Sequence, residues 1–137
     1  MRRVLAALAL LASSFAVTSP ASASSCEGVQ VVVDFTALGG GVETGCAAGD
    51  PASGLAALTD AGFTYSFVPR RPGLVCTIKS LPNPCKMPTT SAYWSYWHAT
   101  PGGAWTYSSV GAGSYDPAPG TVEGWSYGTG VAPGATP

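Results

Sequence analysis

The residues of this chain that could do chemistry are aromatic rings, and they are concentrated in its last third. All four tryptophans lie within residues 92–127, together with every tyrosine except Tyr65. Apart from tyrosines, the titratable groups of that stretch are only His98, Asp116 and Glu123. Rings with few charges around them build small cores, and they also bind flat, largely uncharged ligands such as sugars or macrocycles.

Rings carried on loops have less reason to be core than rings carried on strands. Tyr115 lies in a glycine- and proline-rich stretch, residues 110–120, and Trp105 lies beside the turn at residues 101–103. We therefore expect Tyr115 and Trp105 to contact a ligand. The rings expected to form the core are Phe35, Phe63, Phe67, Trp97 and either Tyr93 or Trp94.

The sequence offers little for catalysis. Any serine–histidine–acid triad must use His98, the only histidine, and no G-x-S-x-G elbow is present. The acids are few and spread along the chain, so a paired-carboxylate site could arise only through tertiary contacts. We expect no enzyme and no metal site. His98 is then a strand histidine that bonds a neighbour or faces water, and the alternative is that it ligates a metal or a metal-containing cofactor.

The four cysteines predict two disulfide bonds. Three connectivities are possible, and pairing Cys26 with Cys46 and Cys76 with Cys85 is favoured because each bond closes a local loop. A zinc site built from all four thiolates is the alternative, although the C-x2-C knuckles that such sites use are missing.

The first 23 residues read as a signal peptide. Arg2 and Arg3 give the positive start, residues 4–12 are apolar, and residues 21–23 form an A-x-A cleavage site. We expect a secreted, extracellular protein with no membrane-spanning segment after cleavage. A lipoprotein acylated at Cys26 is the alternative, but Ala23 stands where a lipobox prefers leucine.

The charge balance argues against nucleic acid as a partner. Without the signal peptide, the cations are Arg70, Arg71, Lys79 and Lys86, against seven acids in the chain. Binding to a phosphate backbone needs a basic patch. Four scattered cations that are outnumbered by acids do not form one. The last residues, 129–137, are small residues, glycine and proline, which predict a flexible tail.

The elements that must position the rings are mostly strands. Asp50 as N-cap, Pro51 in the first turn and Gly62 as the stop predict one short helix of about ten residues. Residues 92–99 carry rings on both faces, so this strand is expected to be central. The result is an α+β domain with a small, mostly antiparallel sheet and one short helix. The predicted strands are residues 28–36, 42–46, 63–68, 74–78, 92–99, 105–108 and 121–127.

The order of motifs resembles the transcobalamin C-terminal-like family, a domain family of bacterial surface proteins. The resemblance covers residues 29–128, and it places the domain at residues 24–128. The chain is also similar to a group of short secreted actinobacterial proteins that share its low charge and its alanine and glycine richness. The motifs are SGLAALTDAGF, GLVCTIKSLPNPC, YWSYWHA, a W-x-Y return, a tyrosine loop and PGTVEGWSYG.

This resemblance implies a β-grasp-like fold and a ligand. In transcobalamin-like carriers the domain caps cobalamin against a helical barrel. It does not supply a cobalt ligand, so no such role passes to His98. The resemblance implies that Tyr96, Trp97, Trp105 and Tyr115 face the ligand. Because the sequence holds no counterpart of the barrel, we expect binding to be weaker than in those carriers.

Our hypothesis from the sequence is a secreted, non-enzymatic ligand-binding domain without a resident cofactor. It would bind cobalamin or a related corrinoid or macrocycle for uptake, and could hand it to an envelope transporter. The alternative is a cell-envelope interaction module that docks glycan or a partner protein through its aromatic surface.

Overall fold

The computed structural model of the chain describes residues 11–16 and 25–137. The predicted signal peptide and its cleavage site lie largely outside the described residues. The elements are β1 (Gly28–Asp34), the 3-10 helix η1 (Thr36–Leu38), β2 (Val42–Ala48), α1 (Gly54–Asp60), β3 (Tyr65–Val68), β4 (Arg71–Ile78), β5 (Tyr93–Ala99), β6 (Thr106–Tyr107), the 3-10 helix η2 (Ala112–Ser114) and β7 (Val122–Gly128).

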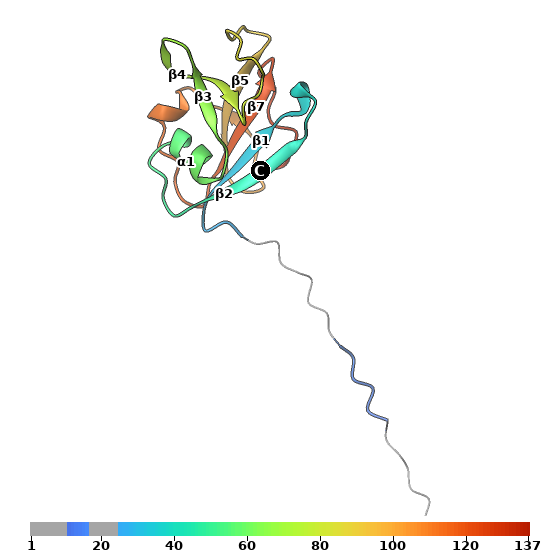
Figure 1. The fold of residues 1–137 in the computed structure, drawn as a ribbon. Coiled ribbons are helices and arrows are strands. Elements are labelled where there is room, and N and C mark those ends of the chain that lie inside the picture. Colours follow the sequence, from blue (N-terminus) through green and yellow to red (C-terminus); the bar gives the residue numbers. More distant parts are fainter. Residues whose placement is uncertain (1–10, 17–24) are drawn as a thin grey trace, which may run out of the picture.

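The strands form a five-stranded sheet in the order β2-β1-β7-β5-β6 and a separate β3–β4 hairpin. All pairings are antiparallel except that of β1 with β7, which lie side by side in parallel at the centre of the sheet. Figure 1 shows α1 and the β3–β4 hairpin on the same side of this sheet. The predicted α+β fold, β-grasp-like and with one short helix, is confirmed.

The two central strands are buried on both faces. Val29, Val31 and Val33 of β1 pack into the main core, as the alternation predicts, but Val32 on the opposite face is fully buried as well. β7 is buried from Val122 to Ser126. We call the face that packs against α1 and the β3–β4 hairpin the core face, and the opposite face the back face.

Helix α1 begins later than predicted. Its N-cap is Ser53, whose hydroxyl accepts a hydrogen bond from the Ala56 N–H at 3.1 Å, so the assignment of Asp50 as N-cap is wrong. The predicted stop is confirmed, because Gly62 has a φ of 99° and the Phe63 N–H donates to the Leu58 carbonyl. The Gly62 N–H also donates to the Thr59 carbonyl, and these two bonds close a Schellman-type end, which only a residue tolerant of positive φ can form easily.

The two predicted disulfides, Cys26–Cys46 and Cys76–Cys85, are both present, and the described residues contain no free cysteine. The first ties the start of β1 to β2, and the second ties β4 to the proline-rich loop that precedes β5. This pairing engages the Cys26 thiol that a lipid anchor would need. Paired cysteines are typical of exported proteins.

Residues 129–137 do not behave as the free tail that their composition predicts. The Gly134 N–H donates to the Asp34 carboxylate at 2.8 Å, and the Trp105 indole N–H donates to the Ala135 carbonyl at 2.8 Å. The Gly102 N–H also donates to the carbonyl of Pro137. The tail is therefore held on the back face through its main chain, a kind of bonding that composition does not reveal.

Candidate ligand-binding groove

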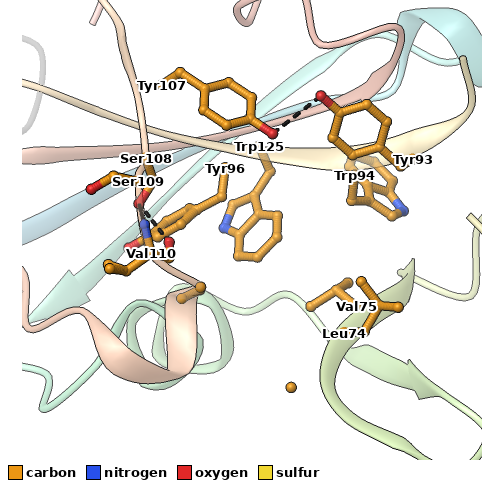
Figure 2. Close-up of a pocket in the computed structure, with 13 residues that line it drawn as sticks. Leu74, Val75, Tyr93, Trp94, Tyr96, Tyr107, Ser108, Ser109, Val110 and Trp125 are labelled. Atoms are coloured by element: carbon orange, nitrogen blue, oxygen red, sulfur yellow. Dashed lines mark hydrogen bonds between the residues drawn. The ribbon is translucent and has the colours of Figure 1, made fainter. Parts of the chain in front are cut away.

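The core face of the sheet is not fully covered, and a hollow of about 310 Å³ remains over its aromatic side chains. Figure 2 shows Trp94, Tyr96 and Trp125 above this hollow, with Leu74 and Val75 of β4 on one side and Val110 on the other. A second hollow of about 580 Å³ adjoins it and is also lined by Trp94, Leu74 and Val75. We call the two together the aromatic groove.

The rings gather because β5 and β7 pair in a register that places them opposite one another. Tyr96 faces Trp125 across the two strands, and Trp94 faces Tyr127. The ring centroids are 4.8 Å apart in the first pair and 5.3 Å apart in the second. Such cross-strand pairs stabilise a sheet, and here they also present a continuous aromatic floor.

The rim of the groove carries exposed apolar side chains. Leu74 and Val110 are exposed, and Met87 is exposed next to Pro88, which lines the second hollow. The Tyr107 hydroxyl lies 3.1 Å from that of Tyr93, and Figure 2 shows this pair across the strands from Trp125, on the back face. An exposed apolar rim around a concave surface is typical of a binding site.

One tryptophan in the groove lacks a hydrogen-bond acceptor. Of the four tryptophans in the chain, Trp94, Trp97 and Trp105 donate their indole N–H groups to protein oxygens at 2.8–3.1 Å. The side chain of Trp125 is 3% exposed, and its Nε1 has no partner among the described residues. In Figure 2 this nitrogen lies on the side of the indole nearer Tyr96. A buried donor without an acceptor is costly, and because this nitrogen is closed to solvent, the cost falls on the packing behind the groove floor.

The residues that the sequence singled out as ligand contacts divide between the two faces. Tyr96 lies in the floor of the aromatic groove, and the Tyr115 ring lies 6.3 Å from it. Trp97 lies on the back face beside Tyr107, with ring centroids 5.0 Å apart. Trp105 packs on the back face over Gly124, where any added Cβ would collide with its ring.

Sequence reasoning missed part of the groove. The sequence placed Trp125 in a strand but did not single it out as a ligand contact. Leu74 comes from the β3–β4 hairpin, which is not part of the five-stranded sheet. The alternation of β5 and β7 could have placed Trp94, Tyr96 and Trp125 on one face. No local signal brings β4 over that face.

A second cluster lies next to the groove, under the segment of residues 108–120. Glu123 of β7 accepts a hydrogen bond from the Tyr96 hydroxyl, and its other oxygen lies 4.0 Å from His98 Nε2. The His98 ring stacks on Tyr115 with centroids 3.6 Å apart. We call Tyr96, His98, Tyr115 and Glu123 the buried acid cluster.

Burial controls ionisation in the acid cluster. It raises the pKa of Glu123 to about 7, although the Tyr96 hydrogen bond pulls the other way. It lowers the pKa of His98 below its usual value. The pKa of Tyr96 is strongly raised by burial and by the neighbouring Glu123 charge. All three groups are therefore pushed toward their neutral forms near neutral pH.

No family model, curated protein or solved structure matches this chain. Within residues 11–16 and 25–137, no group of three or more metal-ligating side chains could hold an ion. No helix in the described part is long and apolar enough to cross a membrane. Function must therefore be argued from the groove itself.

Proposed function

We propose that this chain is a secreted, non-enzymatic domain that binds a flat, largely uncharged ligand in the aromatic groove. The observation that carries the proposal is the concave aromatic floor formed by Trp94, Tyr96 and Trp125 under an exposed apolar rim. The ligand would stack on these rings and contact the apolar rim. The groove lining contains no charged side chain, which favours a neutral contact surface on the ligand.

A corrinoid is the first ligand to test, because the resemblance to the transcobalamin C-terminal-like family implies one. An edge of the corrin ring or its amide side chains would enter the groove. The chain would then cover part of the ligand, and affinity would be limited by the surface left in water.

The experiment is equilibrium dialysis of the oxidised protein against hydroxocobalamin, with two rim variants beside the wild type. We expect saturable binding at micromolar concentration, and a loss of about tenfold on changing Leu74→Ser or Val110→Ser because apolar contact area is removed. Val42→Ser is the matched control, since Val42 is 38% exposed and Leu74 40%, and Val42 lies on β2 away from the groove. Trp105→Phe on the back face should also bind normally.

Equal losses in Leu74→Ser and Val42→Ser would place the ligand elsewhere. Absence of saturable binding at millimolar hydroxocobalamin would remove the corrinoid and leave other neutral ligands, sugars first, to be tested by the same variants.

The exposed rim also favours a second candidate, docking of a polymer on the cell envelope. Tyr107, Val110 and Leu74 lie at the surface and could contact a chain that extends beyond the groove. This reading predicts that the protein is retained on insoluble cell-wall polysaccharide, that Leu74→Ser is not, and that hydroxocobalamin does not compete. Competition by hydroxocobalamin would instead support the capture of a small ligand.

A further inference from the structure

Two buried polar atoms face each other in the acid cluster without any hydrogen bond. They are Oε2 of Glu123 and Nε2 of His98, 4.0 Å apart, and neither has a partner within the described residues. A carboxylate oxygen and an unprotonated imidazole nitrogen are both acceptors, so they cannot satisfy each other. A single proton between them would satisfy both, provided that the side chains close by about 1 Å to hydrogen-bond distance.

The surroundings place this proton on Glu123. Its side chain is 1% exposed against 20% for His98, so a charge costs more on the carboxyl. Oε1 already accepts from the Tyr96 hydroxyl, which leaves Oε2 to carry the proton. The shifts of the two pKa values act in the same direction, since burial raises that of Glu123 and lowers that of His98.

No other charge competes for Glu123. The titratable groups that face it are Tyr96 and His98 from β5, and Tyr115 of the segment 108–120 packs against the rings of these two residues. α1 contributes Gly54, and β1 contributes Val31 in register, and neither of these residues titrates. His98 is the only ion-pair partner that Glu123 has in the described part of the chain.

The pair is linked mechanically to the segment 108–120. His98 stacks on Tyr115, and the Tyr115 carbonyl accepts a hydrogen bond from the Gly54 N–H at 2.9 Å. Gly54 lies so close to the cluster that a Cβ there would overlap the Tyr96 hydroxyl. Residues 108–112 of the same segment form one wall of the aromatic groove.

We propose that Glu123 and His98 share one proton, and that this proton holds the segment 108–120 against the sheet. When the proton leaves for solvent as pH rises, Glu123 carries a negative charge in a site where its side chain is 1% exposed, and this buried charge favours an opening that lets water reach it. His98 and the stacked Tyr115 then move outward, the Gly54–Tyr115 hydrogen bond weakens, and the groove wall loosens. This pH-dependent loosening of the segment 108–120 goes beyond the proposed ligand binding and does not depend on which ligand is bound.

The test is nuclear magnetic resonance of the ¹⁵N-labelled protein without any ligand. His98 is the only histidine, so its ring nitrogens give an unambiguous signal. We expect a neutral ring with the proton on Nδ1 near neutral pH, because Nε2 accepts from Glu123. Protection of the Gly54 amide, corrected for intrinsic exchange, should fall about tenfold from about pH 6 to about pH 8. The Gly40 amide, which bonds the Phe35 carbonyl in a distant turn, is the control and should not change.

The variant Glu123→Gln tests whether the effect comes from the shared proton or only from the packing of the side chain, because glutamine has the same shape but cannot ionise. Its amide keeps an oxygen for Tyr96 and supplies a permanent N–H donor to His98, so it imitates the protonated acid. We expect Gly54 protection in this variant to be high and independent of pH. A doubly protonated His98 near neutral pH, or Gly54 protection that is flat in the wild type, would overturn the proposal. The wild-type spectra decide the question even if the variant does not fold.

Discussion

Glu123 is the residue in this structure whose burial needs the most explanation. A carboxyl inside an apolar sheet is expensive when ionised, and here it has one hydrogen-bond donor, Tyr96, and one unpartnered oxygen. Asp34 on the back face shows the contrast. Burial raises the pKa of Asp34, but hydrogen bonds from Thr36 and Gly134 outweigh it and leave that pKa below the usual value. The same type of group is thus kept charged at one site and neutral at the other by the number of donors around it.

This difference predicts how stability depends on pH. The folded pKa of Glu123 is raised from 4.5 to about 7, so the folded protein binds more protons than the unfolded one between these values. Its contribution is complete below pH 4.5 and is lost as pH rises through about 7. His98 acts oppositely, since its lowered pKa favours the folded state above 6.5 and opposes it in acid. We expect the free energy of unfolding to fall by about 2 kcal/mol from pH 5 to pH 8.

Urea unfolding at a series of pH values measures this slope, with Glu123→Gln beside the wild type. The variant cannot ionise at residue 123, so its profile should be flat or should rise slightly over the same range. Parallel profiles for the two proteins would show that the slope comes from another group.

At the scale of elements, the start of α1 positions the acid cluster. The helix begins at Gly54, whose missing side chain lets the chain pass directly over Tyr96 and Glu123. A short helix of this kind has little stability of its own, so its cap and its packing decide where it forms. Ser53 supplies the cap, and the carboxylate of Asp50, three residues earlier, accepts no hydrogen bond in the described part of the chain.

The capping assignment can be tested by two substitutions on the same approach to α1. Ser53→Ala should lower the free energy of unfolding by about 1 kcal/mol because the Ala56 N–H loses its acceptor. Asp50→Ala should change it by less than about 0.5 kcal/mol, as for an ordinary surface position. Urea denaturation gives both values, and a larger loss for Asp50→Ala would mean that the helix starts where the sequence pattern suggested.

At the scale of the whole molecule, the ends of the domain are tied to the sheet. The Cys26–Cys46 bond secures the start of β1, and residues 129–137 return to the back face to bond Asp34 and Trp105. The tail thereby covers the face of the sheet that neither α1 nor the β3–β4 hairpin reaches. This second layer explains why β1 and β7 are buried on both faces.

Removal of residues 129–137 should therefore destabilise the domain. The truncation loses three hydrogen bonds, from Gly134 to Asp34, from the Trp105 indole to Ala135 and from Gly102 to Pro137, so we expect a loss of about 2–3 kcal/mol. The matched control removes only residues 136–137, which breaks the Gly102–Pro137 bond and should cost about 1 kcal/mol. If urea midpoints of the long truncation and the full chain coincide, the tail does not stabilise the domain.

Local patterns were sufficient for the elements of this fold. Alternating valines indicated β1, the short spacing of the cysteines indicated both disulfides, and Gly62 marked the end of the helix. Each of these signals depends on neighbours in the chain, because strand alternation, loop closure and a positive φ are properties of short segments. For the same reason the α+β class followed from the order of the elements.

The binding site depended on contacts between distant segments, and only the tertiary structure decided it. Tyr96 and Trp97 are adjacent in sequence, yet they lie on opposite faces of β5, so a motif that contains both cannot show which one faces the groove. Leu74 reaches the groove from a separate hairpin. The pairing of Glu123 with His98 requires β5 and β7 to lie antiparallel in one particular register. Register and layer packing follow from the burial of the whole core, and no short stretch of sequence carries that information.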